Sequence, residues 1–180
     1  MLKSSEIAAL RKLDAQMRKD LGPAEVSLDV IEFKDVLAVG GPAAQRGSSL
    51  RKSRANCRGS RARMTLTNRH PLVRIDPAEP NTLKIGSPGA TLRFTVSPDA
   101  YYPVGISFLL LEGVAKPDDQ ARLGLLNFDQ SQIRRLDHVL YVTDTFNDEI
   151  PYDRYKFSVI IQRARDGALG IIDPDIVHES

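Results

Sequence analysis

Residues 155–162 read YKFSVIIQ, and this stretch decides the fold class. Its apolar side chains recur at every second position, which is the period of a β-strand with one buried face: Tyr155, Phe157, Val159 and Ile161. Residues 92–96 alternate in the same way, while residues 104–111 are apolar at both parities, which predicts a central strand covered on both faces. Shorter apolar runs lie between Pro, Gly, Asn and Asp at 72–75, 82–85, 123–128, 133–136, 139–143 and 169–172. This pattern, with no helical periods between the strands, predicts a mainly β protein with an immunoglobulin-like antiparallel β-sandwich; a closed barrel is the alternative.

The chain before residue 64 has a different composition. Residues 4–21 place apolar side chains near a 3.6-residue repeat and are followed by Gly-Pro, which predicts a short N-terminal helix. Residues 26–30 alternate as a short strand does. We therefore expect an appendage of helix and strand at 1–41, a flexible basic linker at 42–63 and the β-sandwich domain at 64–180. Because Met64 directly follows the linker, a translation start at that position also stays open.

The net charge of +2 conceals a strong asymmetry along the chain. Residues 36–75 contain nine Lys or Arg and no acidic residue, so 16 of the 25 basic residues remain against 23 acidic ones elsewhere. Basic residues on a flexible tether can contact phosphates without reading sequence, and six are candidates for such contacts: Arg51, Lys52, Arg54, Arg58, Arg61 and Arg63. The segment has no aromatic side chains on which bases stack, so a solvated linker is favoured and nucleic-acid binding is the weaker interpretation.

Two proline-rich acidic connections flank the predicted strands. The first reads Asp-Pro-Ala-Glu-Pro at 76–80, and the second reads Asp-Pro-Asp at 173–175. Proline restricts both its own backbone and that of the residue before it, so Asp76 and Glu79 in the first connection are held stiffly. They are candidate ligands for a divalent cation or a small polar molecule: Asp76, Glu79, Asp173 and Asp175. A calcium site needs six or more oxygen ligands, however, so a turn at 76–80 and a solvated chain end at 173–175 are favoured.

The string DPAEP at residues 76–80 resembles the motif for which the small bacterial DP-EP family is named. The resemblance covers residues 64–180, including YYPVGI at 101–106 and GIIDPD at 170–175. It implies a compact β domain of uncharacterised function, without catalytic residues that could be carried over to this chain.

The remaining residues indicate a binding module and no enzyme. The chain has no G-x-S-x-G motif and a single cysteine, and Asp137 and His138 are adjacent, so on a strand they point to opposite faces. We expect no cofactor and a non-enzymatic module that binds a protein partner or itself. The alternatives are a cation or small-ligand domain and weak nucleic-acid contact by the linker. No apolar run approaches the roughly 20 residues of a membrane span and the start lacks a secretory leader, so we expect a cytoplasmic protein without membrane contact.

Overall fold

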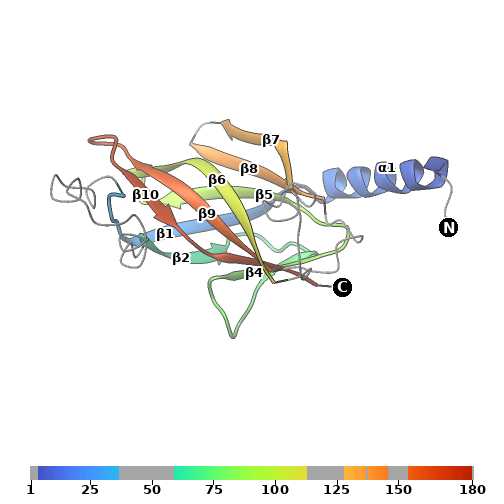
Figure 1. Ribbon diagram of the computed structural model, residues 1–180, viewed down its shortest axis with the longest axis horizontal. Helices are drawn as coiled ribbons and strands as arrows, with labels where there is room; N and C mark the ends of the chain where they lie inside the picture. The colour runs from blue at the N-terminus through green and yellow to red at the C-terminus, as the bar shows by residue number, and fades with distance from the viewer. Residues whose placement is uncertain (1–3, 37–58, 113–127, 137, 146–153, 180) are drawn as a thin grey trace, which may run out of the picture.

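The described residues of the protein form two β-sheets packed against one another and one helix that projects from them (Figure 1). This computed structural model describes residues 4–36, 59–112, 128–136, 138–145 and 154–179. The helix is α1 (Ser4–Leu21), over the residues that the sequence predicts. No helix in the described part of the chain is long and apolar enough to cross a membrane.

Both sheets are mixed, because each contains one parallel pair of strands. The first sheet runs β2 (Arg61–Leu66), β1 (Ala24–Glu32), β5 (Thr91–Ser97), β8 (Val139–Asp144) and β7 (Phe128–Leu136). The second runs β10 (Leu169–Ile172), β9 (Arg154–Arg163), β11 (Asp175–Glu179), β4 (Thr82–Gly86) and β3 (Val73–Ile75), and β6 (Tyr101–Glu112) pairs with β9.

The parallel pairs correct the expectation of antiparallel sheets. Strand β1 is parallel to β5, and β11 is parallel to β4. In both pairs the partners lie far apart in the sequence, so the connection is long enough to bring the second strand back in the same direction. Alternation of apolar residues reports a buried face and carries no information on strand direction, which is why the sequence did not reveal these pairs.

One hydrophobic core fills the space between the two sheets. The alternating residues of β9 form its centre, because Tyr155, Phe157 and Val159 are all 0% exposed. The ring of Phe157 lies 5.5 Å from that of Phe94 on the facing sheet. Burying one such large apolar side chain stabilises the fold by about 1.5–3 kcal/mol. The strand predicted from residues 155–162 is thus the middle of the core.

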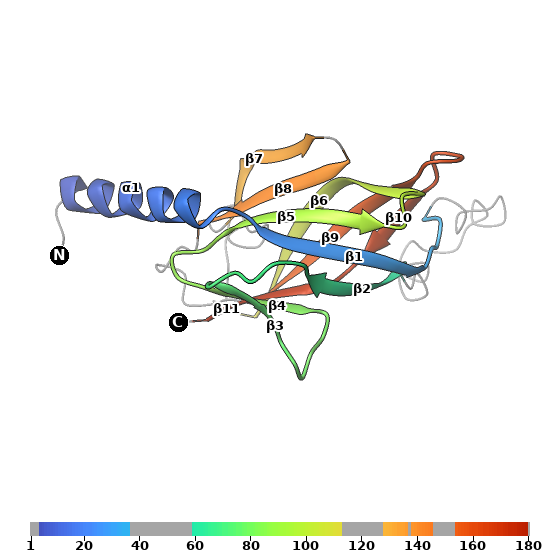
Figure 2. The same ribbon diagram turned by 180° about the vertical axis from the view of Figure 1, so that it is seen from behind.

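The first sheet begins well before the expected boundary at residue 64. Strand β1 lies between β2 and β5, as Figure 2 shows, and Ala24, Val26 and Leu28 are at most 1% exposed. Residues 61–63, which we expected in the linker, belong to β2. An edge strand needs an apolar residue only at alternate positions, so Arg61 and Arg63 are compatible with a strand that turns Ala62 inward. The rest of the predicted linker, residues 42–58, lies outside the described residues.

Strand β6 differs from the prediction of a strand covered on both faces. In the described part of the chain it pairs only with β9, and the side chain of Leu109 is 46% exposed. Its inward-facing Phe108 is 4% exposed and stacks on Phe128 with ring centroids 3.8 Å apart. A run with apolar residues at both parities therefore belongs to an outer strand here and not to a central one.

The segments that flank residues 37–58 both attach to β10. The backbone N–H of Val36 donates to the carbonyl of Leu169 over 2.8 Å, and that of Ser60 donates to the carbonyl of Ile171 over 2.7 Å. The Ser60 hydroxyl is 2.9 Å from the backbone N of Lys34, whose N–H donates to it. These bonds join the start of β2 to the second sheet.

Helix α1 contacts the described parts of the sheets near its C-terminal end. The guanidinium of Arg18 donates to the carbonyl of Pro88 over 2.5 Å. Gly22 ends the helix with a φ of +70°, a left-handed conformation that glycine adopts without strain. Nε2 of His70 lies 3.3 Å from the carbonyl of Gly22, and the N–H of Leu72 donates to Nδ1 of the same ring over 3.2 Å. The imidazole therefore donates through Nε2 and accepts through Nδ1, which is its neutral form.

Candidate functional site

A groove with a volume of about 590 Å³ runs beside β2 and is lined by several sequence-predicted site residues. We call it the edge groove. One wall is residues 59–64, and the other is formed by Pro80-Asn81 and residues 172–174. Apolar side chains of Leu28 and Met64 lie at its base.

The groove exists because the two sheets separate at this edge. Strand β2 ends the first sheet, and the second sheet is interrupted where Asp173-Pro174 connects β10 to β11. This connection is fixed in place, since the carbonyl of Pro174 accepts from the N–H of Phe157 over 3.0 Å. The N–H of Asp175 donates to the carbonyl of Asn81 over 2.9 Å, which ties the wall from 172–174 to the wall from 80–81.

The backbone of β2 presents hydrogen-bonding groups to the groove. The N–H of Thr67 donates to the carbonyl of Glu25 over 2.9 Å, and the register continues with Leu28 opposite Met64. In an antiparallel pair the hydrogen-bonded and non-bonded positions alternate. The backbone groups of Ala62 and Met64 consequently point away from β1, on the side of the groove. A row of such groups on an edge strand is a template for another strand.

The two acidic connections meet at one corner of the molecule. Nη2 of Arg154 lies 2.8 Å from Oε2 of Glu79 and 2.8 Å from Oδ2 of Asp175, so one guanidinium joins both connections. Glu79 and Asp175 line a second hollow of about 260 Å³, which shares Pro80, Asn81, Asp173 and Pro174 with the edge groove.

The other two predicted acidic residues are also held by cations. Oδ1 of Asp173 accepts from the Ser158 hydroxyl over 2.6 Å, and Oδ2 is 3.5 Å from Nζ of Lys156. Asp76 lies outside both hollows, and its carboxylate is 3.0 Å from Nζ of Lys84. The hydrogen bond from Lys84 lowers the pKa of Asp76, with a smaller contribution from the N–H of Ala78.

These pairings define what the acidic residues do. Across the described ranges, no three side chains of His, Cys, Asp or Glu gather closely enough to hold a metal ion. The carboxylates instead tie the two connections to β4 and β9 through ion pairs. Cation binding by these residues stays a prediction.

Two of the six predicted basic residues lie on the edge groove. Arg61 and Arg63 are adjacent on the outer face of β2. The side chain of Arg61 is 73% exposed, and its only ion pair among the described residues is a long one of 4.0 Å to Glu32. The other four lie outside the described residues: Arg51, Lys52, Arg54 and Arg58. Nucleic-acid contact by this segment stays a prediction as well.

Sequence reasoning missed the residues that organise this corner. Arg154, Lys156 and Ser158 occupy the outward positions of β9, and each contacts a carboxylate of residues 173–175. The alternation in residues 155–162 does show that these positions face outward. Their partners became visible only once β11 was placed beside β9.

No family model matches the sequence, and no curated protein matches it either. The resemblance to the DP-EP family thus stays a prediction, and the edge groove is interpreted from its own chemistry.

Proposed function

We propose that the protein is a non-enzymatic binding module that holds an extended segment of a protein partner in the edge groove. One observation carries this proposal: β2 directs the backbone groups of Ala62 and Met64 towards a groove with an apolar base. Addition of a strand to a sheet edge uses main-chain hydrogen bonds for affinity and side-chain contacts for specificity. The groove offers both kinds of contact.

The side chains of β2 indicate which segment fits. A strand added to β2 places its residues beside those of β2 on the same faces of the sheet, with strands about 4.8 Å apart. Its outward residues would be neighbours of Arg61 and Arg63, and its inward residues would be neighbours of Met64. We therefore infer a segment in which acidic and apolar residues alternate.

The far wall of the groove is held by ion pairs before any segment binds. Arg154 and Lys156 hold the acidic connections by ion pairs, so residues 172–175 need little ordering when a segment binds. Side-chain and loop ordering opposes association, and its absence leaves more of the contact energy for affinity.

The proposed class of fold is a variant of the immunoglobulin-like sandwich. Two packed sheets with one shared core support it. The parallel pairs β1–β5 and β4–β11 distinguish this variant from one built of antiparallel strands alone.

The test uses a fluorescent five-residue peptide of alternating valine and glutamate, titrated against the full chain by anisotropy. Ala62→Pro removes the N–H that points to the groove and is tolerated on an edge strand, whereas Ala62→Val keeps the N–H. Loss of one main-chain hydrogen bond and displacement of the added strand should weaken binding about tenfold for Ala62→Pro and little for Ala62→Val.

Two further measurements make the result specific. Binding should weaken with salt, and a peptide of alternating valine and lysine should bind less well, because Arg61 and Arg63 repel it. Equal binding by Ala62→Pro, with an unchanged melting temperature, would exclude strand addition at β2.

A further inference from the structure

The edge groove is closed at one end by a strand of the second sheet. Ser60 immediately precedes β2, and alternate backbone N–H groups point to the same side of a strand, so its N–H lies on the groove side with those of Ala62 and Met64. That N–H donates to the carbonyl of Ile171 over 2.7 Å. The approach is close, because a Cβ on Gly59 would lie 2.7 Å from the same carbonyl. Strand β10 therefore occupies the place beside Ser60 into which an added strand would otherwise continue.

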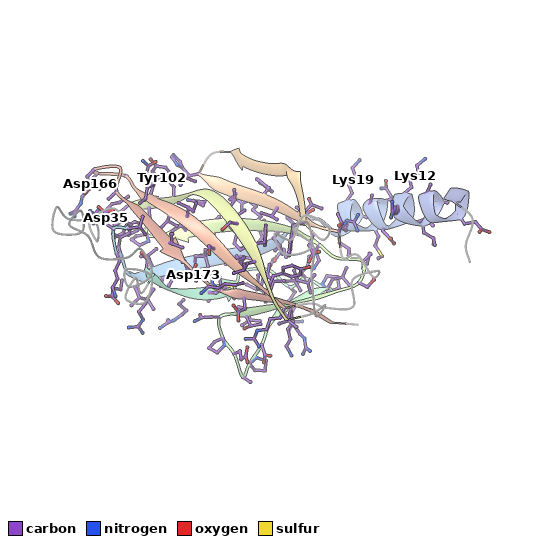
Figure 3. All side chains as sticks on the ribbon, in the orientation of Figure 1. Lys12, Lys19, Asp35, Tyr102, Asp166 and Asp173 are labelled. Carbon is purple, nitrogen blue, oxygen red and sulfur yellow. The ribbon has the colours of Figure 1, made fainter. Side chains whose placement is uncertain are left out.

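Beyond Ile171 the chain turns away from β2, and this turn leaves the rest of the groove open. Strand β10 ends at Ile172, and Asp173, labelled in Figure 3, begins the connection to β11. Strand β11 lies between β9 and β4, away from β2. Among the described residues, the edge of β2 is thus blocked at Ser60 and borders the groove from there to Met64. A segment that pairs with β2 must end or bend at Ser60, so a chain terminus fits this groove better than the middle of a chain.

The charges at the closed end decide which terminus fits. The side chain of Arg61 is 73% exposed, and its ion pair to Glu32 spans 4.0 Å. The same Glu32 carboxylate lies 3.2 Å from Nζ of Lys34. Asp173, the acidic residue that lines the groove, is already paired with Lys156 over 3.5 Å. The charge left to compensate at this end is positive, and a terminal carboxylate compensates it whereas a terminal ammonium does not.

We propose that the edge groove binds the C-terminal segment of a partner protein, added antiparallel to β2, with its carboxylate at the N–H of Ala62 and beside Arg61. This inference rests on the proposed function and specifies which part of the partner binds. An antiparallel strand ends at the closed end of the groove because β2 begins there. A carboxylate that accepts from a backbone N–H beside a guanidinium makes a charge-assisted hydrogen bond, which is stronger than the bond of a neutral carbonyl.

The register of the added strand gives the order of its last three residues. The last residue lies opposite Ala62, the residue before it lies opposite Arg63, and the third from the end lies opposite Met64. Cross-strand neighbours share a face of the sheet, and opposite charges attract across it. Ala62 is small and packs inward, so it leaves room for a larger apolar neighbour. We therefore expect an apolar last residue, an acidic residue before it and a second apolar residue in third place.

The first experiment compares peptides that carry a fluorophore at the N-terminus, titrated against the full chain by anisotropy. The reference peptide alternates valine and glutamate, with valine at both ends and a free carboxylate. Its C-terminal amide should bind about tenfold more weakly, because the charge-assisted hydrogen bond is lost. Two glycines added after the last valine should weaken binding about as much, because the longer chain meets β10 at Ser60. Two glycines added before the first valine are the matched control and should leave the affinity unchanged.

The second experiment assigns the effect to Arg61. Arg61→Gln removes the charge of an exposed side chain and should weaken binding of the free acid about threefold, while the amide should bind as it does to the wild type. Arg165→Gln removes the same charge from a side chain that is 74% exposed and does not line the groove, so both peptides should bind it as they bind the wild type. Melting temperatures verify that both variants remain folded.

The possible results distinguish the C-terminal segment from strand addition in general. Equal binding of the acid, the amide and the C-terminally extended peptide, all weakened by Ala62→Pro, would overturn the C-terminal segment and leave strand addition at β2 in place. Loss of binding on N-terminal extension alone would show a parallel strand and would overturn it too. Binding that Ala62→Pro leaves unchanged, or binding by no peptide, would overturn the proposed function itself. A mass of twice 19.9 kDa by light scattering, reduced to one chain by Ala62→Pro, would assign the groove to a second copy instead.

Discussion

Strand β9 and helix α1 carry apolar residues at equally regular spacing and bury them to opposite degrees. Tyr155, Phe157 and Val159 of β9 are 0% exposed, whereas Leu13 of α1 is 65% exposed. Periodicity determines which element forms, and burial depends on whether another element faces it. The first sheet faces β9, whereas the described parts of the sheets do not cover the apolar side chains of α1. The contrast shows that an amphipathic pattern is evidence for a contact but not for where the contacting surface comes from.

The largest expected effect separates these two regions directly. Phe157→Ala removes a fully buried ring that contacts Phe94 and should cost about 3–5 kcal/mol of unfolding free energy. Leu13→Ala at low protein concentration should change it by less than about 0.5 kcal/mol, because the side chain is exposed. Urea denaturation followed by circular dichroism measures both. Similar losses of unfolding free energy for the two variants would mean that Leu13 is buried.

A smaller effect is expected where the acidic connections join the second sheet. Arg154→Ala removes the ion pairs to Glu79 and Asp175, and we expect a loss of about 1 kcal/mol because the three groups form a network near the surface. Thermal unfolding at low and high salt measures it, with the difference shrinking in salt. Arg165→Ala is the matched control, since its side chain is 74% exposed and its ion pair to Asp166 is 3.5 Å long. Equal losses for both arginines would contradict the network.

Acid should loosen the junction between α1 and the sheets before it affects the core. Burial lowers the pKa of His70, and the hydrogen bond to the Gly22 carbonyl opposes this only in part. Because the folded pKa is below the unfolded value of 6.5, the neutral ring contributes stability at higher pH, and this is lost as pH falls through the folded pKa. The protection of the Leu72 amide from hydrogen exchange, relative to an unstructured amide at the same pH, should fall in that range because its N–H donates to Nδ1. An exchange rate in His70→Asn with the same pH dependence as wild type would argue against this role.

The smallest effect concerns an exposed pair at the end of the molecule away from α1 (Figure 3). The hydrogen bond from Arg163 lowers the pKa of Asp166 from 3.8 to about 2. The lowered value means that the contribution of this pair is present above pH 3.8 and is lost as pH falls towards 2. Arg163→Gln should raise the pKa of Asp166 towards 3.8, as measured by carboxyl NMR titration. A value that stays near 2 in the variant would assign the shift to another group.

The sequence predicts where the helix and strands form better than it predicts which strands pair. The helix at 4–21 and the core strand at 154–163 follow from periodicity, which is a local property. The pairing of β11 with β4 is a contact between distant residues, so Asp175 was interpreted as a chain end although it opens a strand. Arg61 and Arg63 were assigned to a linker by average composition, which hides the inward positions of Ala62 and Met64. The edge groove depends on all of these pairings, and no local pattern could have located it.

The attachment of Val36 and Ser60 to β10 has a consequence for how this fold can be altered. Their acceptors, the carbonyls of Leu169 and Ile171, are two residues apart on one strand, which is about 7 Å. Val36 and Ser60 are therefore held at adjacent points of the second sheet. Loop-closure cost grows only slowly with length, so joining these points by a short turn, a long tether or an entire inserted domain leaves the register of β1 and β2 intact. The same position is suited to new chain termini in a circular permutant, and to carrying a reporter domain beside the edge groove.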